Sequence, residues 1–106
     1  MELAFAERDL RRLCESAATA QRRLGPEVAA ALKARVADLW AADTVKDLPF
    51  APRAEPDARP ATMLFALVDG FHIRFRSNHH QHRTIDGAPD WSAVRRIQIT
   101  AIERIA

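Results

Sequence analysis

The segment TMLFALVDGFHIRFRS, residues 62–77, decides the fold of this chain. Residues 62–68 form one apolar run, Asp69-Gly70 is a strong signal for a tight hairpin turn, and residues 71–77 alternate strictly between apolar and polar side chains. Because side chains alternate across a strand, one face of the second strand would consist of Phe71, Ile73 and Phe75, and the other of His72, Arg74 and Arg76. We therefore predict a β-hairpin with one apolar and one basic face.

Upstream of this hairpin the apolar pattern is that of a short strand and two helices. Residues 2–6 alternate and predict a brief strand at a sheet edge. Residues 9–24 place apolar side chains on one helical stripe. Gly25-Pro26 then predicts that this helix ends and a second begins, because glycine closes a helix in the left-handed conformation and proline suits a first turn. The second helix should extend to about Ala42 and form an antiparallel hairpin with the first.

Loops and a final strand complete the predicted fold. Residues 44–48 predict one helical turn, and the four prolines within 49–60 predict an extended surface loop under which Trp40 would pack half-buried. Residues 78–91 form a polar loop, and the last strand covers about 94–104. Trp91 would either anchor the start of that strand or stack on a nucleic-acid base.

The polar loop contains the run His79-His80-Gln81-His82. Imidazoles are common ligands of zinc, nickel and copper, but adjacent histidines on an extended loop point apart. No cysteine or carboxylate has a matching spacing. We therefore interpret the run as a polar loop and predict no metal site.

The predicted class is α+β, with the order β-α-α-β-β-β and the helical hairpin packed on one face of a small, mainly antiparallel, twisted sheet. The length of 106 residues leaves room for one domain, residues 1–106. No apolar run approaches the ~18 residues of a membrane span, and the first residues do not resemble a secretory signal. The only cysteine, Cys14, lies on an apolar helical stripe and predicts a buried, unreactive thiol. These features favour a cytoplasmic protein.

The positive charge excess lies in the C-terminal half of the chain. Residues 61–106 contain six arginines, four acidic residues and all four histidines. In residues 1–48 the basic and acidic residues are equal in number. If the helices cover the apolar face, the other face presents a group of polar and basic side chains with no acidic residue between the arginines: His72, Arg74, Arg76, Arg96 and Gln98. Such a face attracts a polyanion. The alternative interpretation is an ordinary solvated face of a two-layer domain.

Seven segments distributed over nearly the whole chain lie at residues 2–6, 13–16, 24–28, 31–39, 46–48, 69–75 and 90–97. In their order these segments resemble the RelE/ParE superfamily of bacterial type II toxins. In their amino-acid residues they resemble its HigB-like branch, the plasmid maintenance killer or "killer suppression" proteins. The resemblance implies a toxin that cuts mRNA, on the ribosome or free of it, until a cognate antitoxin of helix-turn-helix type binds it. It implies no metal, no cofactor and no membrane partner.

Metal-independent RNA cleavage needs a group that deprotonates the 2′-OH, cations that stabilise the phosphorane, and a proton for the leaving oxygen. In the toxins that this chain resembles, these groups lie on the open sheet face and near the end of the last strand. His72 stands where those toxins usually have an arginine, and the chain ends Glu103-Arg-Ile-Ala where they often have Asp-Tyr-His. The expected site residues are therefore His72 and Arg104 for catalysis, and Arg74, Arg76 and Arg96 for RNA binding.

Because the C-terminal Tyr-His pair is missing, two alternatives stay open. The first is a ParE-like protein that poisons DNA gyrase without cutting RNA. The second is a degenerate homologue that only binds antitoxin.

Overall fold

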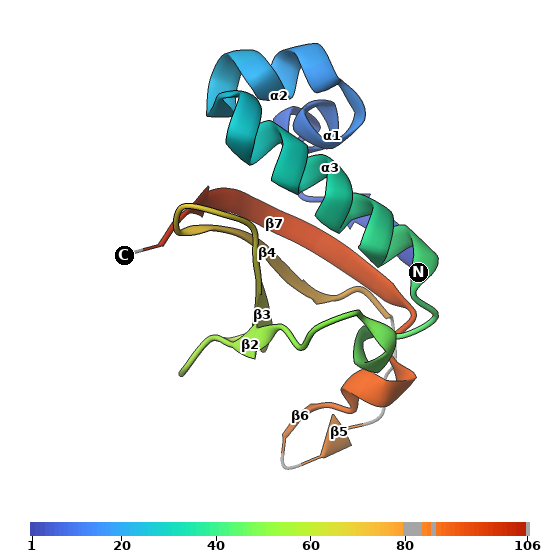
Figure 1. The fold of residues 1–106 in the computed structure, drawn as a ribbon. Helices are drawn as coiled ribbons and strands as arrows, with labels where there is room; N and C mark the ends of the chain where they lie inside the picture. Colours follow the sequence, from blue (N-terminus) through green and yellow to red (C-terminus); the bar gives the residue numbers. More distant parts are fainter. Residues whose placement is uncertain (80–83, 86, 106) are drawn as a thin grey trace.

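Three helices cover one face of a five-stranded sheet (Figure 1). The computed structural model describes residues 1–79, 84–85 and 87–105. In chain order the main elements are β1 (Glu2–Phe5), α1 (Arg8–Glu15), α2 (Ala17–Leu24), α3 (Pro26–Ala41), β2 (Arg53–Ala54), β3 (Thr62–Ala66), β4 (Phe71–Ser77) and β7 (Arg96–Arg104). Two short 3-10 helices, Val45–Asp47 and Trp91–Ala93, and a separate small hairpin of β5 (Thr84–Ile85) and β6 (Ala88–Pro89) complete the fold.

The helical layer contains one more helix than the sequence predicted. Ser16 interrupts residues 9–24 with an extended backbone, φ −121° and ψ 107°, and its hydroxyl accepts a hydrogen bond from the Thr19 N–H at 3.2 Å. Serine satisfies a free N–H at a helix start in this way, so it ends α1 and begins α2. The junction at Gly25 is confirmed, with φ 86° at the glycine and Pro26 in the first turn of α3. Among the described residues, no helix is long and apolar enough to cross a membrane.

The sheet has the strand order β1-β7-β4-β3-β2. β1 lies at one edge, as predicted, and pairs parallel with β7, whereas the other pairs are antiparallel. The mainly antiparallel sheet is thus confirmed. At the opposite edge, β2 is a two-residue strand within the region predicted to be loop, and it pairs with β3.

The predicted hairpin turn joins β3 and β4. Asp69 and Gly70 both have positive φ, 55° and 78°, which is the type I′ geometry that suits the twist of antiparallel strands. The Phe71 N–H donates to the Val68 carbonyl at 3.0 Å across the turn, and the Leu67 N–H donates to the Phe71 carbonyl at 2.8 Å. In the paired strands Ala66 lies opposite His72 and Leu64 opposite Arg74, a register shifted by one residue from that of a plain two-residue hairpin.

The hydrophobic core lies between the helices and the apolar face of β3, β4 and β7. Phe65, Ile73, Phe75, Ile97 and Ile99 are fully buried, and they pack with Leu32 and Leu39 of α3. The predicted alternation of β4 is therefore confirmed: Ile73 and Phe75 face the helices.

The two tryptophans lie in different surroundings. Trp91 stands edge-on to Phe75 with ring centroids 6.2 Å apart, which supports its interpretation as an anchor before the last strand. Trp40 is 55% exposed, which agrees with the expected half-burial, and its packing under the proline-rich segment stays a prediction. Phe50, within the proline-rich segment, has its ring 4.8 Å from Phe65 and under the Arg35 guanidinium.

Candidate functional site

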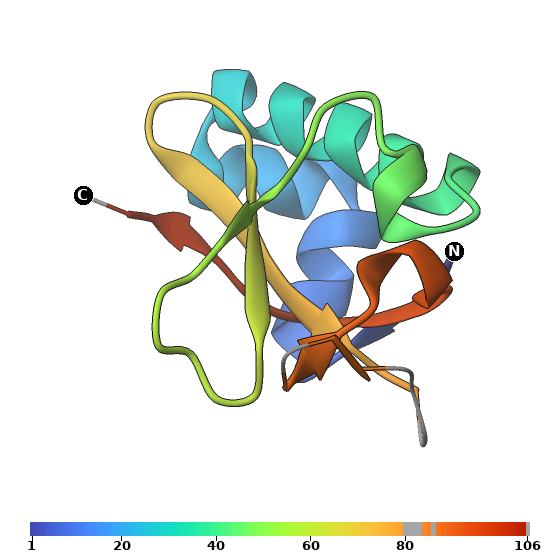
Figure 2. The ribbon, with the colours of Figure 1, turned by 90° about the horizontal axis from the view of Figure 1, so that it is seen from below.

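The helix-free face of the sheet presents the polar side of β4. His72, Arg74 and Arg76 alternate with the buried Ile73 and Phe75, so all three lie on the side away from the helices. Figure 2, seen from below, shows the sheet in front of the helices on this side. Part of this face is covered by other residues. Leu64, which pairs with Arg74, is only 3% exposed.

Arg74 lies between two carboxylates. Its Nε donates to Glu55 Oε2 at 2.7 Å, and its Nη1 donates to Glu103 Oε1. Partial burial by itself lowers the pKa of Arg74, but the two hydrogen bonds outweigh it, and the pKa of the guanidinium is raised above its ordinary value. Arg74 therefore already has the charge-assisted partners that a phosphate would offer.

Other arginines of the predicted set also have acidic partners. Arg96 Nε is 2.9 Å from Glu2 Oε2 on the neighbouring edge strand, and Arg104 Nη2 is 2.7 Å from Asp69 Oδ2 at the hairpin turn. The expectation of arginines without nearby acids is therefore wrong. Sheet pairing brings Glu2, Glu55 and Glu103 beside them from segments far apart in the chain, which no local charge count reveals.

Arg76 has a neutral partner instead. Its Nε donates to Gln98 Oε1 at 2.8 Å, and Gln98 lies opposite it on β7. No acidic side chain of the described residues forms an ion pair with it. The hydrogen bond at Nε orients the guanidinium, and the Nη groups have no protein hydrogen-bond partner among the described residues. Arg76 is thus the cation of β4 that is most able to bind an anion.

His72 has a defined tautomer. Its Nδ1 lies 2.9 Å from the Gly70 carbonyl oxygen, which can only accept a hydrogen bond. Nδ1 therefore carries the proton, and Nε2 of the neutral ring has an unshared lone pair. This arrangement suits a proton acceptor.

The structure does not bring Arg104 together with His72. A β-bulge shifts the pairing of β7 between Arg74 and Phe75, so that Glu103 pairs with His72 and Arg104 with Phe71. The guanidinium of Arg104 lies 5.0 Å from the centre of the Phe71 ring, on the opposite face from His72. Uninterrupted alternation along β7 would have placed Arg104 on the helix-free face, and no feature of the sequence marked the bulge.

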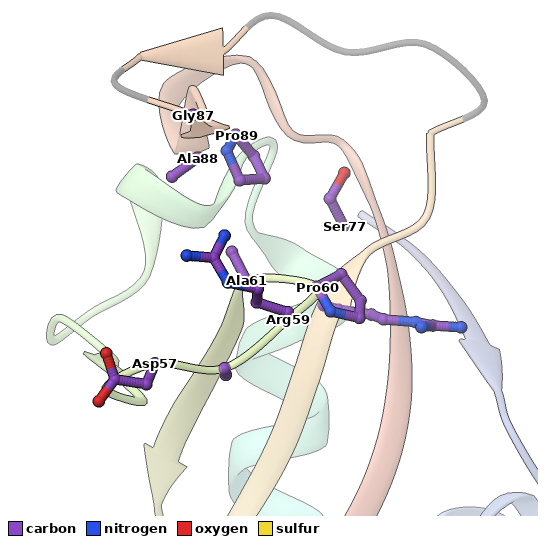
Figure 3. Close-up of a pocket in the computed structure, with 10 residues that line it drawn as sticks. Asp57, Arg59, Pro60, Ala61, Ser77, Gly87, Ala88 and Pro89 are labelled. Carbon is purple, nitrogen blue, oxygen red and sulfur yellow. The ribbon is translucent and has the colours of Figure 1, made fainter.

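A hollow of about 410 Å³ lies at the end of β4, and we call it the Arg76 hollow (Figure 3). Its walls come from residues 57–61, from Arg76 and Ser77, and from residues 87–89. Sequence reasoning missed it because its two loop walls are distant in the chain. The prolines Pro60 and Pro89 were visible, but nothing indicated that they face one cavity.

The histidine run lies largely outside the described residues, which exclude His80, Gln81 and His82. His79 is described, and its Nε2 accepts hydrogen bonds from the backbone N–H groups of Arg95 and Arg96 at 2.8 and 3.2 Å. In the described part of the chain, no group of three or more histidine, cysteine or acidic side chains is placed to hold a metal ion.

Comparison with known proteins identifies no relative. No family model matches the chain, and neither a curated protein nor a solved structure is significantly similar to it.

Proposed function

We propose that this protein is a toxin of a type II toxin–antitoxin system, of the RelE/ParE type, that cleaves single-stranded RNA on the helix-free face of its sheet. The main support is the polar side of β4, where an imidazole with a free Nε2 and two arginines follow one another at alternate positions. Segment order and the resemblance stated above add to this support. A cytoplasmic location and a helix-turn-helix antitoxin belong to the same proposal.

In this proposal Nε2 of His72 removes the proton of the 2′-OH, and the 2′ oxygen attacks the adjacent phosphorus. The bond from phosphorus to the 5′ oxygen then breaks, and the leaving 5′ oxygen takes a proton from water. Gly70 holds the ring in the required tautomer through Nδ1. Arg74, two residues from His72 on the same face, stabilises the charge that develops on the phosphorane once the phosphate competes with its carboxylate partners, and Arg76 binds the RNA farther along β4. Arg104 lies on the other face and is left out of this group.

The test is expression without antitoxin, with growth and the 5′ ends of transcripts measured. We expect growth arrest and new RNA ends with the wild type, and loss of both with His72→Ala. Arg22→Ala, on α2, is a matched control because it removes an arginine from the helical side. Unchanged RNA cleavage by the His72→Ala variant would refute the assignment of His72 as the group that deprotonates the 2′-OH.

A second candidate is a ParE-like gyrase poison. Two observations favour it: carboxylates pair with Arg74, Arg96 and Arg104, and the residue opposite His72 on β7 is the acidic Glu103 rather than a clear proton donor. Accumulated cleaved DNA–gyrase complexes with intact transcripts would select this candidate. Absence of any growth effect would select a homologue that only binds antitoxin.

A further inference from the structure

We propose that the Arg76 hollow binds one nucleotide of the RNA strand, a short way along the strand from the nucleotide that is cut at His72, and so determines base preference. This inference rests on the proposed function and adds a substrate subsite to it. Three features of the hollow support the nucleotide site: its charged wall, its apolar walls and its position on β4.

The hollow has cations at its wall. Arg59 and Arg76 both line it, and neither forms an ion pair with an acidic side chain of the described residues. The one acidic residue of its described lining, Asp57, lies at the edge away from Pro89 and Ser77 (Figure 3). Arg76 lines the hollow while its Nε is hydrogen-bonded to Gln98 on β7, so Arg59 is the main cation of the hollow. A guanidinium group with an acid only at the margin favours a phosphate group within the hollow.

The remaining walls suit the base and sugar. Pro60 and Pro89 contribute rings, and Ala61 and Ala88 contribute small apolar side chains. A volume of about 410 Å³ is far larger than a bare phosphate needs and lies within the ~300–1,000 Å³ typical of small-molecule sites. Flat apolar walls beside a cationic group match a single unstacked nucleotide, because single-stranded RNA is recognised through splayed-out bases.

The position of the hollow separates it from the reacting centre. Arg76 is four residues after His72 on the same face of β4, and a strand rises about 3.3 Å per residue, so their backbones are about 13 Å apart. A nucleotide in the hollow is therefore not the one that reacts. It lies a short way along a strand of RNA that follows β4.

The experiment titrates the whole chain with nucleoside 5′-monophosphates, a nucleoside and inorganic phosphate, with binding followed by amide NMR shifts. We expect a monophosphate to shift residues 57–61, Arg76 and 87–89, and to bind at least threefold more tightly than phosphate or the nucleoside. Arg59→Gln should weaken monophosphate binding about three- to tenfold, whereas Arg23→Gln on α2 should not. Ala88→Phe should block the hollow and leave the described hydrogen bonds of His72 and Arg74 in place.

Equal affinity for inorganic phosphate, or shifts confined to other surfaces, would overturn the nucleotide site. Ala88→Phe should also change the base preference of RNA cleavage. Cleavage with unchanged base preference in that variant would overturn the subsite and leave the proposed function standing. Monophosphate binding in the hollow without any RNA cleavage by the wild type would instead refute the proposed function and support a nucleotide site.

Discussion

Replacement of Glu55 by glutamine tests whether Arg74 is able to bind RNA. Arg74 and Glu55 form a partly buried ion pair, in which their side chains are 27% and 29% exposed and the distance from Arg74 Nε to Glu55 Oε2 is 2.7 Å. Any phosphate that approaches Arg74 must compete with this carboxylate. Glu55→Gln keeps the size of the side chain and removes the charge, so we expect tighter RNA binding.

The expected gain follows from the strength of such a pair. A largely solvent-accessible ion pair contributes about 0.2–1 kcal/mol, and partial burial places this one in the upper half of that range. About 0.5–1 kcal/mol corresponds to about two- to fivefold in affinity. One additional cation available to phosphate should also steepen the slope of log K against log salt by about 0.7 for single-stranded RNA.

The assay is fluorescence anisotropy with a labelled single-stranded RNA at several salt concentrations. Glu15→Gln is the matched control: it removes the same charge from α1, where Glu15 pairs with Arg11 at 3.3 Å. Thermal melting of both variants shows whether either change loosens the fold. If the Glu55→Gln and Glu15→Gln variants have the same RNA affinity and the same salt slope, Arg74 has only a structural role. The prediction that Arg74 binds RNA is then refuted.

Three further predictions concern stability and reactivity. Burial, with the nearby Glu15 charge, raises the pKa of Cys14 from its ordinary value of 9.0 to about 12. Alkylation of Cys14 in the folded protein at pH 8 should therefore be on the order of a thousandfold slower than in the chain unfolded by urea, and comparable rates would contradict this. Because the unfolded thiol ionises near pH 9 and the folded one does not, stability should fall as the pH rises from about 9 toward 12 in urea titrations, and a Cys14→Ala variant should lack this component. Ile73→Ala should reduce the free energy of unfolding by about 2–5 kcal/mol, because the side chain is fully buried, and a loss below about 1 kcal/mol would argue against its place in the core.

The hairpin and the helix junction could be predicted from the sequence because local rules govern them. Strict alternation set the faces of Ile73 and Arg74, and the positive φ values at Asp69 and Gly70 are those that a two-residue turn requires. Gly25 and Pro26 likewise marked the start of α3. The break at Ser16 was missed because the apolar stripe continues through it, while the backbone follows the serine cap.

The environment of the candidate site could not be predicted, because it depends on long-range pairing. Glu55 lies in the proline-rich segment and reaches Arg74 only after β2 and β3 pair. The bulge in β7 places Glu103 rather than Arg104 on the face of His72. One unpaired residue in a strand exchanges the faces of every residue that follows, and sequence periodicity alone does not locate it.

The most direct test of the account is amide NMR mapping of a non-cleaved single-stranded RNA analogue, with 2′-deoxy sugars, on the full chain. We predict the largest shifts at His72, Arg74, Arg76 and Gln98, on the helix-free face, and at the walls of the Arg76 hollow. Shifts centred on α2 and α3, or no saturable shifts at low salt, would contradict the claim that this face of the sheet binds RNA.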